Sequence, residues 1–141
     1  NAYDYFIYNE KNIKNYMVVT FDLNNLKMCN DNYGHSSGDA YIIHSAHIIE
    51  TTFDRFGKCY RIGGDEFCCL IPDAAEFQIE RFIQKMQQDI AILNNKNIIP
   101  TEVGIACGYA LATPDDADIE KVRERADEMM YHNKKVLKGL I

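Results

Sequence analysis

Residues 63–66 read Gly-Gly-Asp-Glu, a tetrad with the residue types of a metal and phosphate site. The apolar runs on either side, residues 58–62 and 67–71, are typical of β-strands, so the tetrad is predicted to be the turn of a hairpin. Glycine is free to adopt positive φ and lets a ligand approach the backbone, while paired carboxylates hold a hard cation. Ordinary solvated turns favour the same residues. The tetrad alone therefore leaves both interpretations open.

A third carboxylate, that of Asp22, follows the apolar run of residues 16–21, which is typical of a buried central strand. If that strand neighbours the hairpin, Asp22 and Asp65 converge at one edge of the sheet. Such a pair suits Mg²⁺, which takes few protein ligands and completes its octahedron with water and substrate phosphates. The metal would lower the pKa of an attacking hydroxyl and neutralise charge on phosphorus. Alternatively, Asp22 only caps a loop.

Other polar residues could complete a nucleotide site. Lys134 and Lys138 lie one turn apart on a predicted helix and could supply cations for a phosphate tail. Asn30 and Asp39 could read a base edge, because a carboxylate accepts from the ring N–H and exocyclic amine of guanine and not from adenine. Structural alternatives exist for these residues too. Asp39 could be a helix N-cap, and the lysines could complement a helix dipole.

Length and charge limit the class of protein. The 141 residues predict one domain spanning 1–141, and the abrupt start at Asn1 suggests an N-terminally truncated fragment of a longer protein. A net charge of −6 argues against binding to a nucleic-acid duplex. We find neither an apolar run of about 20 residues nor a signal peptide. We therefore expect a cytoplasmic domain, whose parent protein can still be membrane-anchored.

Five cysteines form an odd set without C-x-x-C spacing, so we expect reduced thiols and no zinc site or disulfide framework. Cys68 and Cys69 are adjacent in a predicted strand, so their side chains should point to opposite faces of the sheet.

Hydrophobic periodicity predicts the order helix, strand, helix, hairpin, helix, strand, helix. Residues 102–111 alternate between bulky and small side chains, which predicts a helix packed very close to the small face. Mixed elements around one sheet indicate an α/β or α+β sandwich. The expected segments are a helix in residues 1–14 with Tyr5, Phe6 and Tyr8 as core contacts, a strand at 16–21, a loop at 24–37, helices at 39–56 (closed by Gly57) and 79–93, a strand at 102–111 and a helix at 115–138.

Three blocks together resemble the GGDEF-domain family of diguanylate cyclases. They are FDLNNLKMCNDNYGHSSGD at residues 21–39, RIGGDEF at 61–67 and RADEMMYHNKK at 125–135, in the family's order and spacing. The resemblance implies a palm-like, ferredoxin-related nucleotide cyclase fold, α+β, with a central, mainly antiparallel sheet flanked by helices. The implied reaction condenses two GTP into cyclic di-GMP and releases two pyrophosphates, in a Mg²⁺- or Mn²⁺-dependent homodimer.

The resemblance also implies roles for individual residues. Asp22, Asp65 and the main-chain carbonyl of Leu23 would ligate the metal, and Glu66 would be the candidate for deprotonating the 3′-hydroxyl. Asn30 and Asp39 would recognise guanine. The phosphates would be held by the backbone at Asn25 and Leu26 and by Lys27, Lys134 and Lys138, and Gly63 and Gly64 would let the nucleotide lie against the turn.

The implied partners are GTP, a second GGDEF domain and an upstream sensory domain, with no nucleic acid. An alternative is a catalytically silent regulatory module that binds GTP or signals through cyclic di-GMP. A cyclase that takes adenine is a third possibility. Asp39 argues against it, because a carboxylate acceptor would there face an acceptor of adenine.

The sequence departs from the family pattern at four places. Asn25-Leu26 replaces aromatic residues, and Lys138 replaces an arginine, which keeps the charge and loses the fork. Residues 54–57 read Asp-Arg-Phe-Gly, so the family's inhibitory R-x-x-D motif is absent and we expect no inhibitory site. The family's N-terminal D-x-L-T-G-L-x-N-R signature is also missing.

Overall fold

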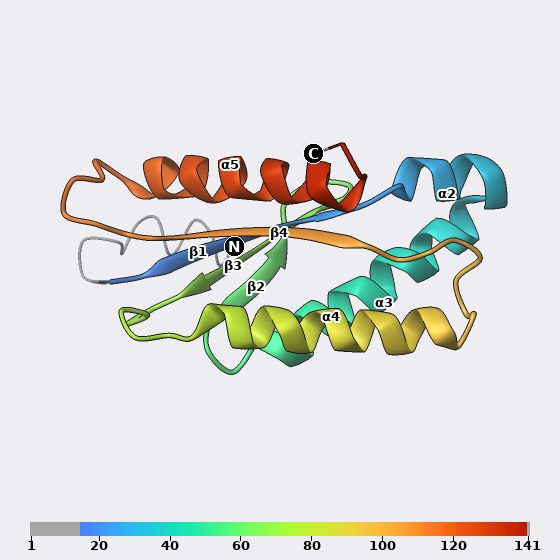
Figure 1. Ribbon diagram of the computed structural model, residues 1–141, viewed down its shortest axis with the longest axis horizontal. Helices are drawn as coiled ribbons and strands as arrows, with labels where there is room; N and C mark the ends of the chain where they lie inside the picture. The colour runs from blue at the N-terminus through green and yellow to red at the C-terminus, as the bar shows by residue number, and fades with distance from the viewer. Residues whose placement is uncertain (1–14, 141) are drawn as a thin grey trace.

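The computed structural model describes residues 15–140 (Figure 1). The predicted N-terminal helix, with Tyr5, Phe6 and Tyr8, lies outside these residues. The described elements are β1 (Met17–Leu23), α2 (Leu26–Tyr33), α3 (His35–Phe53), β2 (Lys58–Arg61), β3 (Glu66–Ile71), α4 (Ile79–Asn95), β4 (Ile105–Leu111) and α5 (Ile119–Leu137).

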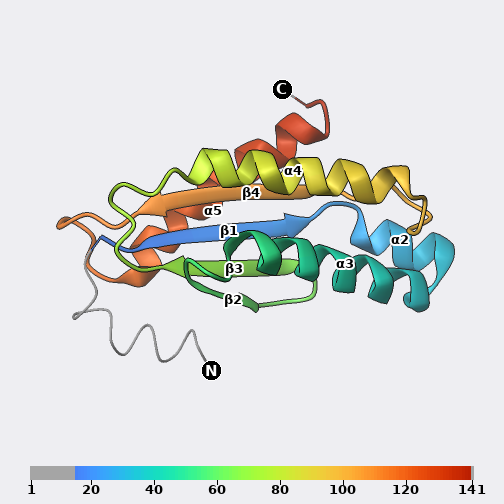
Figure 2. The ribbon, with the colours of Figure 1, turned by 90° about the horizontal axis from the view of Figure 1, so that it is seen from below.

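Within this range the strands form one antiparallel sheet in the order β2-β3-β1-β4 (Figure 2). Every residue of β1 is buried, as predicted for a central strand. The predicted hairpin is also confirmed, because β2 pairs with β3 and the Gly-Gly-Asp-Glu tetrad connects them. Antiparallel pairing with helices on both faces makes this an α+β fold, as the sequence predicts.

The helices cover the two faces unequally. Helices α3 and α4 lie on one face of the sheet and α5 lies on the other (Figure 2). Alternation along the strands divides the core accordingly: Val19 and Phe21 pack with α3 and α4, whereas Val18 packs with α5. Cys69 joins the first cluster and Cys68 the second, which confirms that the two thiols point to opposite faces.

The small face of β4 lies against α5. A Cβ built on Gly108 would lie 2.1 Å from the Ala126 carbonyl oxygen and 2.3 Å from the Met130 nitrogen. No side chain fits between these backbones, so the close helix predicted from the small residues is confirmed. This contact fixes the height of α5 above the sheet, and with it the position of the lysines near the end of α5.

The predicted loop at residues 24–37 is wrong, because most of it is helical. Asn25, at φ 61°, starts α2, and Gly34, at φ 90°, separates α2 from α3. Only Leu26 and Cys29 of α2 are buried, so its apolar periodicity is too weak to reveal a helix. Because α3 already begins at His35, Asp39 is not its N-cap.

Other boundaries also differ from the predictions. Helix α3 ends at Phe53 with Asp54 in the right-handed helical region, so Gly57 is not a C-cap. Gly57 is required for another reason, since a Cβ there would lie 2.0 Å from the Leu70 carbonyl oxygen. Strand β4 begins at Ile105 rather than at 102. Helix α5 begins after Asp118, whose side chain accepts from the Lys121 amide.

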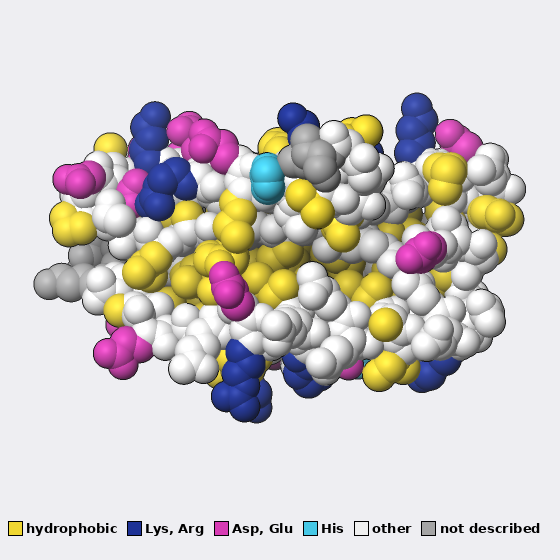
Figure 3. Space-filling view, viewed as in Figure 1, with side chains coloured by type: hydrophobic (Ala, Val, Ile, Leu, Met, Phe, Trp, Pro, Cys, Tyr) yellow, Lys and Arg dark blue, Asp and Glu magenta, His cyan; other side chains and the backbone are white. Residues whose placement is uncertain are grey.

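Strand β4 forms one edge of the sheet, and side chains of α5 cover part of its backbone. The Cys107 amide donates to Asn133 Oδ1 at 2.9 Å, and Arg125 donates to the Leu111 carbonyl. Apolar side chains remain visible between α5 and α4 along this edge (Figure 3). None of the helices in residues 15–140 has the length and apolar character to cross a membrane.

Replacing Gly108 with alanine should lower the free energy of unfolding by about 1–3 kcal/mol, because the added methyl group must push α5 away from β4. Urea denaturation measures this change. Gly63→Ala is the matched control, since a Cβ there meets no atom of residues 15–140 within 4 Å, and its effect should stay within about 0.5 kcal/mol. Equal losses in the two variants would contradict the close packing of α5.

Candidate active site

The pairing of β1 with β3 places three carboxylates together. Asp22 is the direct cross-strand partner of Glu66, and Asp65 precedes Glu66 in the hairpin turn. One carboxylate oxygen from each of the three lies within 4.8 Å of the others. Partners across an antiparallel pair project to the same face of the sheet. Asp22 and Glu66 therefore both project to the α5 side.

Burial and mutual repulsion raise the pKa values of two carboxyls in this cluster. Asp22 is almost completely buried, and this burial raises the pKa of its carboxyl above the usual value. The charge of Asp65 raises that pKa further, while the Lys134 ammonium group lowers it in part. Burial likewise raises the pKa of Glu66, and the negative charges of Asp22, Asp127 and Asp65 raise it further. An additional positive charge would relieve this repulsion.

The donor set fits a hard divalent cation. Asp22 Oδ1 is buried and accepts no hydrogen bond from residues 15–140. This oxygen is therefore available to bind a cation. The Leu23 amide donates to the Asp65 carbonyl at 2.8 Å. Because the N–H and C=O of one strand residue point the same way, the Leu23 carbonyl also points toward the hairpin. Carboxylate and carbonyl oxygens are the ligands that Mg²⁺ and Mn²⁺ prefer.

Helix α5 brings cationic side chains to the same edge of the sheet. Lys134 Nζ lies 3.3 Å from Asp22 Oδ2, and the charge of Lys138, one turn later, also acts on Asp22. Asn133, which binds the Cys107 amide, fixes the rotation of the helix next to Lys134. Lys134 is thus paired with Asp22 and does more than complement the helix dipole.

An arginine side chain holds the turn of the hairpin. Arg61 donates from Nε to the Gly63 carbonyl at 2.9 Å and from its terminal nitrogen to the Gly64 carbonyl at 2.8 Å. Neither glycine has φ in the left-handed region. A Cβ on either would meet nothing within 4 Å in the described chain, so the fold itself does not require glycine at these positions. The space beside the turn is open to a ligand.

A buried tyrosine holds the turn between β1 and α2. The Tyr41 hydroxyl donates to the Asn24 carbonyl at 2.6 Å and accepts from the Gly104 amide at 3.0 Å. Burial raises the pKa of Tyr41 to about 12, so the hydroxyl keeps its proton. Asn25 follows directly in the left-handed region. Tyr41 thereby anchors the backbone that leads into the N-terminus of α2.

The N-terminus of α2 is free to receive an anion. It has no side-chain cap within the described chain and no acidic residue in its first turn. Its first amides therefore lack helical partners and carry the positive end of the helix dipole. Asn25 and Lys27 are exposed there, whereas the Leu26 side chain is buried, so Leu26 can contribute only its backbone.

Asn30 and Asp39 belong to two different helices that pack against each other. A Cβ on Gly38 would lie 1.6 Å from Asn30 Oδ1, so the Asn30 amide occupies the space that Gly38 leaves. The exposed Asp39 is the next residue along α3. Asn30 thus contacts the residue that directly precedes Asp39 in α3.

Three residues of this region have roles that sequence reasoning missed. Arg61 stands in the RIGGDEF block, and its position two residues before the glycines is a signal that could have been used. Asn133 likewise stands in the RADEMMYHNKK block, although its partner lies 26 residues away. Tyr41 gave no local signal, because its partners lie 17 and 63 residues away.

Comparison with known proteins supports the family that the sequence resembles. A sequence profile described as "Diguanylate cyclase, GGDEF domain" matches residues 6–138. The diguanylate cyclase DgcN of Escherichia coli is 31% identical over 119 residues, which cover 83% of this chain and 29% of DgcN.

Two solved structures share the fold. The GGDEF domain of DgcB from Caulobacter crescentus, in complex with c-di-GMP, has a TM-score of 0.76 at 22% identity, covering 95% of this chain and 78% of that one. The active GGEEF domain of a diguanylate cyclase from Vibrio cholerae has a TM-score of 0.75 at 21% identity. The match covers 92% of this chain and 83% of that one.

The fold is thus that of the solved GGDEF and GGEEF domains. The chain belongs to the GGDEF-domain family. It spans only about a third of the length of the curated relatives it matches.

Replacing Tyr41 with phenylalanine should lower the free energy of unfolding by about 1–3 kcal/mol, because the Asn24 carbonyl and the Gly104 amide lose their hydroxyl partner in a buried place. Chemical denaturation measures the loss. Tyr33→Phe is the control, because Tyr33 is 53% exposed, and it should be nearly neutral. A Tyr41→Phe variant as stable as the control would show that the hydroxyl anchors nothing.

Asp22 should make the protein less stable as the pH rises, when divalent cations are absent. Its folded pKa is raised, so the folded protein still binds a proton at pH values where the unfolded chain has released it. The contribution of Asp22 to the free energy of unfolding must then fall as the pH rises from the ordinary pKa of 3.8 through the raised pKa of the folded protein.

Urea denaturation of wild type and Asp22→Asn across pH, in the presence of a chelator, measures this contribution. The difference between the two should shift in favour of Asp22→Asn as the pH rises through that window and then level off. A difference that is constant with pH, or that shifts in favour of wild type, would contradict the raised pKa.

Proposed function

We propose that this chain is the catalytic domain of a diguanylate cyclase, which condenses two GTP into cyclic di-GMP and releases two pyrophosphates. The observation that carries the proposal is the cluster of Asp22, Asp65 and Glu66, with Lys134 beside it. Membership of the GGDEF family and the similarity to named diguanylate cyclases support the same reaction.

The acidic residues have two different roles, metal binding and proton transfer. Asp22, Asp65 and the Leu23 carbonyl would hold Mg²⁺ or Mn²⁺, which supplies a Lewis acid when bound. Glu66 takes the proton of the 3′-hydroxyl of GTP as that oxygen forms a bond to the α-phosphorus of the other GTP. The bond from that phosphorus to the pyrophosphate oxygen breaks. The raised pKa of Glu66 makes its carboxylate a stronger base than an exposed glutamate.

The remaining site residues bind the nucleotide. Lys134, Lys138 and Lys27 balance the charge of the phosphates, and the backbone at Asn25 and Leu26 presents the free amides of α2. Gly63 and Gly64 leave open space beside the turn for the nucleotide.

Asn30 and Asp39 select the base. Asp39 offers only acceptors, which match the N1–H and exocyclic amine of guanine. With adenine, an acceptor of Asp39 would face the ring N1, which is also an acceptor, so the site should favour GTP over ATP.

One copy of the chain offers one such cluster in its described part, but the reaction joins two nucleotides. A second GGDEF domain must therefore bring the other GTP, with the two sites facing each other. An upstream sensory domain in the parent protein would control this encounter. Turnover should then depend on enforced pairing of the two chains.

A fusion to a parallel coiled coil supplies this pairing. Incubated with GTP and Mg²⁺, the fused dimer should make cyclic di-GMP, detected by chromatography. Asp65→Ala should reduce the rate by about 100-fold or more, because it removes a predicted metal ligand. Glu76→Ala is the matched control, since Glu76 is exposed beyond the opposite end of β3, and it should keep the wild-type rate.

No product from the fused dimer would contradict the proposal. Tight GTP binding by calorimetry in that case would point to the silent regulatory module. Full activity of Asp65→Ala would refute the metal assignment alone.

A further inference from the structure

The two arms of the hairpin carry a pair of cysteines in direct contact. Cys59 on β2 is the cross-strand partner of Cys69 on β3, and their Sγ atoms lie 3.3 Å apart. All five cysteines of the chain are free thiols in this structure. The pair belongs to neither the acidic cluster nor the residues around it.

The backbone geometry at this pair suits a disulfide. The Ile62 amide donates to the Glu66 carbonyl, so that pair is hydrogen-bonded, and alternation along the ladder makes Cys59 and Cys69 a non-hydrogen-bonded pair. Cα atoms of such pairs are about 4.5 Å apart, which lies within the range that disulfides span. The bond can therefore form without moving either strand.

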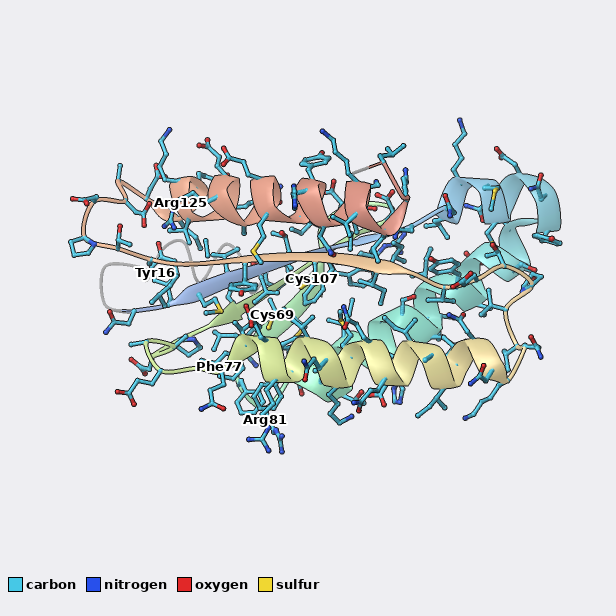
Figure 4. The ribbon with its side chains drawn as sticks, viewed as in Figure 1. Tyr16, Cys69, Phe77, Arg81, Cys107 and Arg125 are labelled. Carbon is cyan, nitrogen blue, oxygen red and sulfur yellow. The ribbon has the colours of Figure 1, made fainter. Side chains whose placement is uncertain are left out.

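The two thiols differ in access. Cys69 is fully buried, packed with the core on the α3 and α4 side of the sheet (Figure 4). Cys59 is only half-buried, because β2 is the outer strand of the sheet. A small oxidant thus reaches Cys59 first. Cys68, although adjacent in sequence, points to the opposite face and cannot reach Cys59.

We propose that Cys59 and Cys69 form a reversible disulfide when the protein meets a peroxide, and that this bond staples the hairpin that carries Asp65 and Glu66. The proposal does not depend on the proposed function. It depends only on the contact of the two sulfurs, their cross-strand register and the exposure of Cys59.

The chemistry balances with hydrogen peroxide as the oxidant. The Cys59 thiolate attacks one peroxide oxygen and the O–O bond breaks, which gives a sulfenic acid. The second oxygen leaves as hydroxide and takes up the proton that the thiol released, so that the products are the sulfenic acid and water. The Cys69 sulfur then attacks the Cys59 sulfur, the S–O bond breaks, and a second water leaves. The first step belongs to Cys59 because its side chain is partly exposed, whereas Cys69 is fully buried.

The staple closes the segment that contains Arg61 and the Gly-Gly-Asp-Glu turn. It restricts the unfolded chain, and it locks the register of the hairpin arms in the folded one. The reduced cysteines can be restored by a dithiol, so the modification is reversible.

Graded peroxide followed by alkylation, digestion without reductant and mass spectrometry tests the pairing in the full chain. A peptide linking Cys59 to Cys69 should accumulate and disappear with dithiothreitol. Cys59→Ser should abolish it, and Cys68→Ser, a neighbouring buried thiol on the other face, should leave it unchanged. Links through Cys68, or oxidation of Cys59 that stops at sulfinic acid without a link, would overturn the proposal.

Thermal unfolding tests the staple separately. The oxidised protein should unfold about 5 to 15 °C higher than the reduced protein, and this gain should be absent in Cys59→Ser. If the protein with the Cys59–Cys69 disulfide unfolded at the same temperature as the reduced protein, the proposal that the bond stabilises the hairpin would be contradicted.

Discussion

The candidate site depends on one pairing, that of β1 with β3, in the register that sets Asp22 opposite Glu66. Side chains alternate along a strand, so a shift of one residue would turn Asp22 toward the α3 and α4 core and away from the hairpin. Nearly every residue of β1 and β3 is buried. Such a shift would therefore move the Asp22 carboxylate into an apolar core and place apolar side chains beside the charged groups of the site. The hydrophobic core therefore enforces the register that the carboxylates need.

The same pairing has an electrostatic cost that α5 offsets only in part. Three carboxylates share a small, partly buried space, and the pKa values of Asp22 and Glu66 rise because the helix and the sheet exclude water there. Lys134 supplies one positive charge, and its position depends on the backbone contact at Gly108 and on Asn133. A divalent cation with the phosphates of a nucleotide would complete the charge balance.

Much of this could be predicted from the sequence, because strong periodicity and local motifs carry it. The hairpin, the central strand, the close helix on β4 and the adjacency of Asp22 to Asp65 all follow from residue patterns. The helix α2 could not be predicted, since its face toward the core has only Leu26 and Cys29. Tyr41 and the sulfur contact at Cys59 depend on pairings that no local pattern encodes.

We propose that Asp22 and its neighbours hold a divalent cation for a nucleotide. Electron paramagnetic resonance of free Mn²⁺, titrated into the protein with a non-hydrolysable GTP analogue, tests it most directly. We expect that wild type removes Mn²⁺ from solution and that Asp22→Asn binds it at least about tenfold more weakly. Equal Mn²⁺ affinity in the two proteins would contradict it.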